Sequence, residues 1–395
     1  EQKLLLKNAP LFGKVNKVSK MQERSFFQDI LTNLLDRKSI FKSFLRKRDS
    51  NDNFSTEELI NNMQNAKGEA SAAVNAEFLF QNIETLNDEK RLNFFHLLAR
   101  KYDINGETLL SAIKDFNKNS SPENLDKVID FSEPKRKEIF RRLNSSERGT
   151  IRLVKLREKL IDIVKDNPDL KRVDNDFLKL FKSWFNPGFL VLKPVDWTTS
   201  AHILEKIIKY EAVHEIKSWK DLRDRLEPSD RRCFAFFHPA MQDEPLIFVE
   251  VALMESNPHK IEEVLSSERK KVKRGDEKSA IFYSISNCQR GLKGVSFGNF
   301  LIKQVANQIK LEFPNIKNFV TLSPVPGFMK WVKGNSVSLY ENIQKRKFND
   351  ELNDLQSDII FSSIDYFSKS LRNDGLPNDP VARFHLGNGA VLDRI

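Results

Sequence analysis

The sequence predicts an α+β chain, with an all-helical first half and a second half in which helices accompany a mixed, mostly antiparallel sheet. Apolar residues recur at helical spacing from about residue 25 to residue 185. An Asn-Pro-Gly motif at 186–188 ends the last helix, and short runs rich in Val, Ile and Phe follow. Because 395 residues are many for one hydrophobic core, we expect two domains, residues 1–187 and 188–395.

The first domain is predicted to be an antiparallel helical bundle. Polar stretches such as NDNFST and NKNSSPEN separate its helical segments. The segments with apolar residues at helical spacing are RSFFQDILTNLLDR (24–37), EKRLNFFHLLARKY (89–102), RLVKLREKLIDIVKD (152–166) and DFLKLFKSWF (176–185). Nothing in this half indicates a catalytic or binding site.

The second domain is predicted from strand-like runs that alternate with helical patterns. Residues 299–313 place an apolar side chain at every fourth position before a proline stops the helix. The stretch AMQDEP indicates a hairpin between two strands. In chain order we expect strand 189–195, helix 201–213, strands 233–239, 246–254 and 279–286, helix 299–313 and strand 318–325.

Composition excludes several classes of protein. Hydrophobic residues make up 39% of the chain and charged residues 30%, so we expect globular cores rather than disorder. No stretch reaches the ~18 uninterrupted apolar residues of a membrane span. The two cysteines, Cys233 and Cys288, support neither a disulfide framework nor a thiolate zinc site, and they favour a reducing intracellular compartment.

The net charge of +10 does not by itself indicate a nucleic-acid binder. Residues 133–182 hold 15 Lys or Arg and 9 Asp or Glu, so +6 of this charge comes from one mixed-charge helical stretch. Such a stretch is more often a solvated helix face than a helix that binds in a nucleic-acid groove, and we expect no nucleic-acid partner. A basic protein can equally bind a small polyanion such as the nucleotide of a coenzyme.

A glycine-rich segment, NCQRGLKGVSFG at 287–298, links a predicted strand to the helix that follows. Three of the chain's 14 glycines, Gly291, Gly294 and Gly298, fall within eight residues. Glycines at the start of a helix let backbone N–H groups face a diphosphate. The spacing matches neither the P-loop nor the dinucleotide-binding G-x-G-x-x-G motif. Two interpretations therefore stay open for the segment alone, a flexible turn or a diphosphate loop.

The layout of this segment resembles that of acetyl-CoA-dependent N-acetyltransferases. Those enzymes carry a loop between a central strand and a helix that binds the pyrophosphate of coenzyme A, with the motif Q/R-x-x-G-x-G/A. In this chain Gly291 stands three residues before Gly294, where the motif has Gln or Arg. The resemblance lies in the layout, and it implies an acetyltransferase-like (GNAT-type) second domain.

The segment VTLSPVPGFMKW at 320–331 holds a serine in a stiff turn. Pro324 and Pro326 lack a backbone N–H and fix φ, so the hydroxyl of Ser323 is held in one direction. A serine before proline is most often only a turn or cap residue. His385 stands between two apolar residues and, alone, is more often a core residue than a catalytic one.

Three longer segments resemble malonyl-CoA decarboxylases: AIFYSISNCQRGLKGVSFGNFLIKQV, EFPNIKNFVTLSPVPGFMKW and RFHLGNGAVLDRI. The likeness continues through GFLVLKPVDW, EAVHEIKSWKDL and RRCFAFFHPAMQDEPLIFVEVAL, and more loosely through FLKLFKSWFNPGFL in the helical half. It implies a helical domain that mediates oligomerisation, as a dimer or tetramer. It also implies an acetyltransferase-like domain that decarboxylates malonyl-CoA to acetyl-CoA and CO2 in fatty acid metabolism.

The resemblance also implies the site residues. The family's catalytic serine falls on Ser323 and its catalytic histidine on His385. Its malonyl-CoA-binding loop falls on Lys293, Gly294, Val295, Ser296, Phe297, Gly298 and Asn299. The basic residues that hold the 3′-phosphate of coenzyme A are not identified by the sequence, and the candidates are Lys271, Lys273, Arg274 and Lys303.

The implied chemistry needs few protein groups. Loss of CO2 from malonyl-CoA leaves a carbanion that the thioester carbonyl delocalises as an enolate, so we expect no metal and no cofactor. We expect His385 to donate the proton, because histidine titrates near neutral pH. Ser323 would hydrogen-bond the malonyl group and help relay the proton, and Asn388 would add an amide donor.

Two other functions stay open from the sequence. An acyl-CoA-dependent acyltransferase on the same fold would need an acceptor site and a base for an amine. A non-catalytic helical scaffold or nucleic-acid binder would use the positive charge and would show steep salt dependence.

The sequence leaves three compartments open, the mitochondrial matrix, the cytoplasm and the peroxisome. Residues 1–22 carry five lysines and one glutamate, which is consistent with the remnant of an organelle presequence, although such segments are usually rich in arginine. Members of the family extend further than Ile395. We therefore expect the second domain to be truncated at its C-terminus, with any peroxisomal tripeptide beyond this point.

Overall fold

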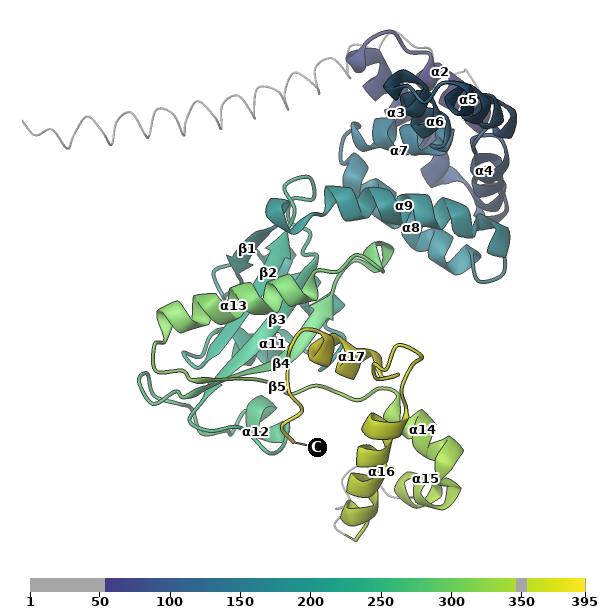
Figure 1. Ribbon diagram of the computed structural model, residues 1–395. Coiled ribbons are helices and arrows are strands. Elements are labelled where there is room, and N and C mark those ends of the chain that lie inside the picture. Colours follow the sequence, from purple (N-terminus) through teal and green to yellow (C-terminus); the bar gives the residue numbers. More distant parts are fainter. Residues whose placement is uncertain (1–53, 346–353, 395) are drawn as a thin grey trace, which may run out of the picture. The chain divides into compact units, whose positions relative to one another are not determined.

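The computed structural model describes residues 54–345 and 354–394 (Figure 1). The chain divides into two compact units, Glu1–Leu180 and Phe181–Ile395. This division falls inside a helix, before the boundary that the Asn-Pro-Gly motif led us to expect at residue 187. The helix expected at 24–37 lies outside the described residues.

The first unit is helical throughout its described part, as predicted. α2 packs against α3, α5 against α6, and α7 against both α3 and α8. The helices are α2 (Thr56–Gln64), α3 (Glu69–Thr85), α4 (Asp88–Arg100), α5 (Gly106–Lys118), α6 (Pro122–Phe131), α7 (Lys135–Asn144), α8 (Gly149–Ile163) and α9 (Lys171–Trp184), with a 3-10 turn η1 (Pro168–Leu170) before α9.

Part of the charge at 133–182 is internal rather than solvated. Arg136 on α7 is fully buried, and its Nε donates to Asp176 Oδ2 on α9 at 2.7 Å. Arg157 on α8 is also buried, and its Nε donates to Asp174 Oδ1 at 2.8 Å. A buried guanidinium needs such a partner because leaving it unpaired is costly. These arginines therefore hold helices together and are not available to a polyanion.

The second unit contains a five-stranded sheet with the strand order β1-β2-β3-β4-β5. The first four strands pair antiparallel, and β5 pairs parallel with β4. The strands are β1 (Val191–Pro194), β2 (Arg231–Phe237), β3 (Ile247–Met254), β4 (Ser279–Asn287) and β5 (Asn318–Thr321). This confirms the predicted α+β class and the mostly antiparallel sheet. The last strand is shorter than expected, because it ends before the Ser-Pro turn.

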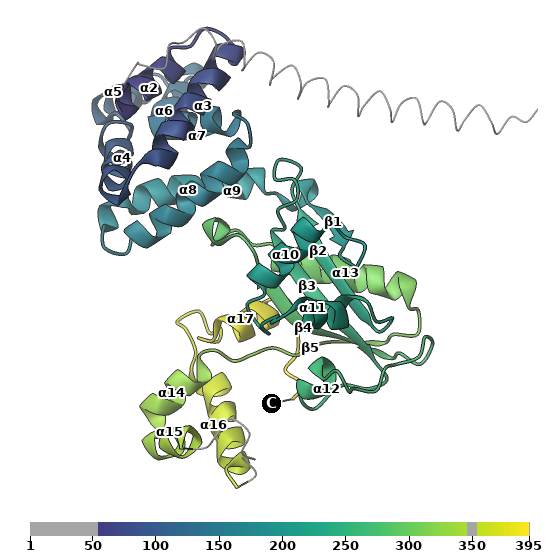
Figure 2. The same ribbon diagram turned by 180° about the vertical axis from the view of Figure 1, so that it is seen from behind.

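Helices cover both faces of this sheet. α13 (Gly298–Glu312) lies on one face, and α10 (Ala201–Tyr210) and α11 (Trp219–Leu226) lie on the other (Figures 1 and 2). Leu204 and Leu222 of the second group pack with Phe248 in one core cluster. On α13 the apolar residues spaced four apart are buried, as the sequence pattern predicts. A short helix, α12 (Glu262–Leu265), and two 3-10 turns, η2 (Pro187–Phe189) and η3 (Arg290–Leu292), complete this part.

Four helices after β5 were not predicted from the sequence. They are α14 (Phe328–Asn335), α15 (Val337–Gln344), α16 (Gln356–Lys369) and α17 (Pro380–Gly387). The first three form a small cluster around Val332, Leu339 and Leu355, and α17 returns to the sheet (Figure 1). Over the described residues, no helix combines the length and apolar character that crossing a bilayer requires.

Candidate active site

A cavity of about 680 Å³ lies where β4 and β5 separate. The two strands pair along Ser279–Phe282 of β4, and the last link is the Leu322 N–H donating to the Phe282 carbonyl at 2.9 Å. Beyond this hydrogen bond, β4 continues to Asn287, whereas the segment that follows β5 turns away at Ser323. Among the described residues, no strand therefore pairs with this edge of β4 beside the cavity.

The cavity wall is mostly apolar with a few polar groups. Its apolar side chains include Val213, Ile247, Phe282, Ile285, Val295, Phe297, Leu322, Val381 and Phe384. Its polar side chains are Tyr283, Asn287, Ser296, Ser323, Arg383 and His385. Both the volume and this composition are typical of a small-molecule site.

Ser323 and His385, the two residues predicted to be catalytic, meet in this cavity. Ser323 Oγ lies 3.0 Å from His385 Nε2, a hydrogen-bond distance. Ser323 stands two residues after the end of β5, where the prolines of the turn stop the strand, and His385 lies on α17. Both side chains line the cavity.

α17 begins with a strong helix start. Asp379 is its N-cap and accepts from the N–H groups of Val381 and Ala382 at 2.9 and 3.0 Å. Pro380 occupies the first helical position, where its missing N–H costs nothing. The helix is only eight residues long, so its position depends on contacts with its neighbours.

Burial lowers the pKa of the His385 imidazole below its ordinary value, because loss of solvent disfavours the charged form. In the free protein at neutral pH the ring is therefore mostly neutral. A neutral imidazole can accept a hydrogen bond at one nitrogen and donate at the other. The Ser323 hydroxyl can take either role, so the pair can pass a proton in either direction.

The glycine-rich segment lines the same cavity. Of its seven predicted binding residues, the five from Gly294 to Gly298 contribute to the wall, whereas Lys293 and Asn299 do not. Gly294 has φ of +91°, a conformation that side-chain-bearing residues rarely adopt. At Gly298 a Cβ atom would lie 2.6 Å from Cζ of Phe384, so glycine is needed for α17 to pack this closely.

None of the four 3′-phosphate candidates lines this cavity. Lys271, Lys273 and Arg274 precede β4, whereas the glycine loop follows it. A nine-residue strand spans about 30 Å. Because the 3′-phosphate and the diphosphate of coenzyme A belong to one nucleotide, a diphosphate at the loop would favour a basic residue at the loop end of β4 over these three. Lys303, on α13, remains a candidate.

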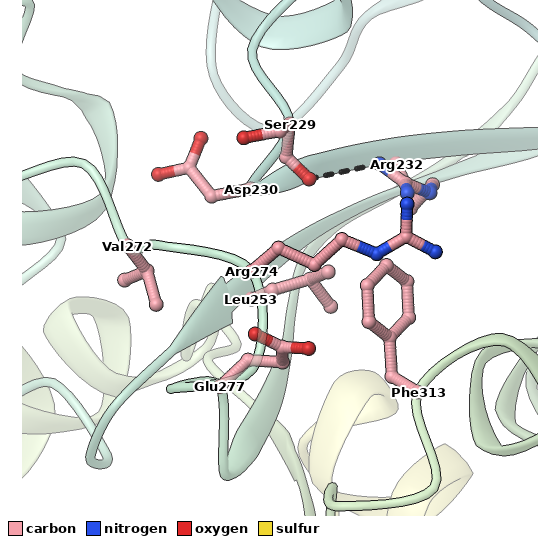
Figure 3. Close-up of a pocket in the computed structure, with 8 residues that line it drawn as sticks. All are labelled: Ser229, Asp230, Arg232, Leu253, Val272, Arg274, Glu277 and Phe313. Atoms are coloured by element: carbon pink, nitrogen blue, oxygen red, sulfur yellow. Dashed lines mark hydrogen bonds between the residues drawn. The ribbon is translucent and has the colours of Figure 1, made fainter.

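A second cavity at that far end of β4 is too small for the substrate (Figure 3). Its volume is about 50 Å³, which leaves room for a few water molecules. Its lining residues are Ser229, Asp230, Arg232, Leu253, Val272, Arg274, Glu277 and Phe313. Arg274 therefore lines this small cavity and not the one that holds Ser323.

Sequence reasoning missed some side chains that line the cavity, and it predicted one residue, Asn388, that does not line it. Tyr283 and Arg383 line the cavity and lie in segments that carry the family resemblance, but the sequence analysis gave neither of them a role. The start of α17 could have been found, because an Asp followed by Pro is a recognisable helix N-terminus. Asn388, expected as an amide donor, forms the C-cap of α17 and is not among the cavity-lining residues.

Comparison with protein families gives matches in both units. Residues 188–395 match the malonyl-CoA decarboxylase C-terminal domain, and residues 102–185 match the malonyl-CoA decarboxylase N-terminal domain. The mitochondrial malonyl-CoA decarboxylase of Anser anser anser is 32% identical over 311 residues, which are 68% of this chain and 61% of that protein. The chain thus spans about 61% of the length of that relative.

Solved structures give a similar result. The crystal structure of malonyl-CoA decarboxylase from Rhodopseudomonas palustris is 45% identical, with a TM-score of 0.79, over 85% of this chain and 86% of that one. The one from Agrobacterium vitis is 43% identical, with a TM-score of 0.78, over 85% of each chain.

Proposed function

The chain belongs to the malonyl-CoA decarboxylase family, and from this premise we propose that it converts malonyl-CoA to acetyl-CoA and CO2. The observation that carries the proposal is the hydrogen bond between Ser323 and His385 in a cavity that the glycine loop also lines. The reaction is that of a carboxy-lyase and would serve fatty acid metabolism.

The substrate supplies the electron sink for this reaction. When the C2–carboxyl bond breaks, its electron pair moves into the thioester carbonyl and forms an enolate. The protein must hold the carboxylate across the carbonyl plane, keep water away, stabilise the enolate and protonate C2. A mostly apolar cavity with a hydroxyl and an imidazole suits these tasks.

In this proposal Ser323 and His385 have separate roles. Ser323 hydrogen-bonds the malonyl group and fixes its orientation. His385 gives its proton to C2 of the enolate, directly or through the Ser323 hydroxyl, and takes a new proton from solvent. No covalent bond to Ser323 forms, because the enolate does not need a nucleophile.

The open edge of β4 supports a binding mode for the arm of the coenzyme. Residues 283–287 have backbone N–H and C=O groups on the side that β5 leaves. Such groups pair readily with an extended chain that carries amides, as the pantetheine arm does. The glycine loop then lies at the start of α13, where N–H groups favour a diphosphate.

A turnover assay tests the function. The purified chain is incubated with malonyl-CoA without any amine acceptor, and both acetyl-CoA and CO2 are measured. We expect the two products in equal amounts. If no CO2 appears and CoA is released only when an amine is added, the protein is an acyltransferase and the proposal is wrong.

We also propose that the helical unit joins copies of the chain into a dimer or tetramer. α5 and α6 pack together and leave five large apolar side chains exposed: Leu110, Ile113, Leu125, Ile129 and Phe131. Light scattering of the wild type and of a Leu110→Glu/Ile129→Glu variant tests this. We expect an oligomer that the variant breaks, and a wild type that runs as a 45.9 kDa monomer would contradict the proposal.

For the compartment, the names of the relatives give a direction. The enzyme of Anser anser anser is named as mitochondrial, so we place the mitochondrial matrix before the cytoplasm and the peroxisome. Fractionation of cells that express the full-length protein tests this assignment, which fails if the protein is absent from the mitochondrial fraction.

A further inference from the structure

The distance between Ser323 and His385 must be set by something outside the pair. The two residues are 62 positions apart and stand on different elements. Ser323 follows a four-residue strand, and His385 belongs to a two-turn helix, so neither element is stable alone. A misplacement of about 1 Å at a reacting group can cost about 10² in rate. The contacts that join these two elements therefore matter for activity.

One buried carboxylate joins them. Asp379 is 1% exposed, and its two oxygens serve different parts of the fold. Oδ1 accepts from the two N–H groups at the start of α17, and Oδ2 accepts from Gly327 N–H at 3.1 Å and from the Tyr366 hydroxyl at 3.2 Å. We propose that Asp379 is the positioning residue that holds His385 at hydrogen-bond distance from Ser323. This inference rests on the proposed function of that pair.

The path from Asp379 to each member of the pair is short and stiff. Gly327 lies four residues after Ser323, across two prolines that fix the backbone. His385 lies six residues after Asp379, within the helix that this residue caps. A shift of the carboxylate therefore moves the serine turn and the histidine helix relative to each other.

The contacts exceed what helix capping requires. An N-cap uses one side-chain oxygen, whereas here the second oxygen binds groups from outside α17. The chain also makes room for this arrangement, because a Cβ atom on Gly327 would lie 2.1 Å from the Tyr366 hydroxyl. Burial and the neighbouring Asp379 raise the pKa of Tyr366 to about 12, so its hydroxyl stays protonated and can donate.

Asparagine separates positioning from capping. In Asp379→Asn the remaining oxygen can still cap α17, since Asn is as good an N-cap as Asp. Its amide nitrogen is a donor and cannot accept from Gly327 N–H, so the link to the serine turn is lost. We expect kcat to fall about 10²-fold while KM for malonyl-CoA stays within about threefold. Asp374→Asn, a change at an exposed aspartate in the preceding loop, is the matched control and should keep wild-type kcat.

A chemical probe tests the geometry without turnover. Diethyl pyrocarbonate modifies accessible imidazoles, and mass spectrometry gives the rate at His385 relative to exposed His202. We expect His385 to react faster in Asp379→Asn than in the wild type. A folded Asp379→Asn variant with wild-type kcat and an unchanged rate of His385 modification would overturn the proposal. A fall in kcat that is matched by an equally large rise in KM for malonyl-CoA would also overturn it.

The experiment also distinguishes a variant that does not fold from a wild type that has no decarboxylase activity. If Asp379→Asn does not fold, Tyr366→Phe removes one bond to the same oxygen, and it must lower kcat and raise the His385 rate or the proposal fails. If the wild type releases no CO2, the proposed function fails, whereas the His385 rates still report on the positioning.

Discussion

At the scale of single residues, burial acts differently on the two members of the pair. The Ser323 hydroxyl stays neutral at any pH of interest, so burial changes only its direction and its partners. The His385 imidazole has a charged form that burial disfavours, which lowers its pKa. The free protein thus holds little of the proton-donating form at neutral pH. In the proposed mechanism, substrate binding raises this pKa again, because the malonyl carboxylate would place a negative charge near the ring.

This predicts two different pH profiles. kcat/KM should fall as pH rises through the free-enzyme pKa of His385, which lies below the ordinary 6.5. kcat reports on the substrate complex, where the carboxylate raises the same pKa. The alkaline limb of kcat should therefore lie at higher pH than that of kcat/KM. Initial rates between about pH 5 and 9 give both profiles. Limbs at the same pH, or none, would show that His385 is not the acid.

Gly298 gives a second prediction at this scale. In Gly298→Ala the new methyl group meets the ring of Phe384, the neighbour of His385 on α17. We expect the ring and the helix to shift and kcat to fall about tenfold or more. Gly334→Ala is the control, because a Cβ there meets nothing within 4 Å. Steady-state kinetics of both variants test this prediction. Equal kcat values would contradict it and would mean that the ring of Phe384 shifts without displacing His385.

At the scale of elements, the sequence predicted what its local pattern encodes. The buried strands and α13 lie close to their expected positions, because their apolar runs and periodicity are strong. α14–α17 were missed: α14, α15 and α17 have only eight residues each, and α14, α15 and α16 bury their apolar side chains mainly against one another. The strand expected to reach residue 325 ends at Thr321, because the prolines stop it earlier than its apolar residues suggest.

Strand β3 carries a buried acid that the sequence gives no reason to expect. Glu250 is fully buried among apolar strand residues, and Arg225 of α11 lies 3.1 Å from its Oε2. Burial raises the pKa of Glu250 to about 7, against the opposing effect of Arg225. The folded state therefore binds this proton more tightly than the unfolded state.

A pH-dependent stability follows from Glu250. The free energy of unfolding should fall as pH rises from about 4.5 to about 7, by up to about 3 kcal/mol. Glu250→Gln cannot titrate, so its stability relative to the wild type should rise over this window. Urea unfolding at both ends of the window measures the difference. Glu255→Gln, at an exposed acid, is the control. A Glu250→Gln effect that does not vary with pH would contradict the assignment.

At the scale of the whole molecule, the site is assembled from distant parts of the chain. The glycine loop, Ser323 and His385 come from three segments, with several helices between the last two. No local spacing encodes a contact across 62 residues, so only the family resemblance named both catalytic candidates. The same resemblance did not name Asp379, whose contacts with both the serine turn and α17 appear only when the elements pack. The contacts between distant segments of the chain therefore form the part of the site that local sequence patterns cannot predict.

The most direct test of the account is the turnover number of three proteins: the wild type, Ser323→Ala and His385→Asn. Loss of one positioned donor typically costs about 10²–10³ in rate, so each variant should release CO2 from malonyl-CoA more slowly by about that factor. Circular dichroism and a thermal melt establish that both variants are folded. If either folded variant keeps wild-type turnover, the Ser323–His385 pair is not the catalytic centre.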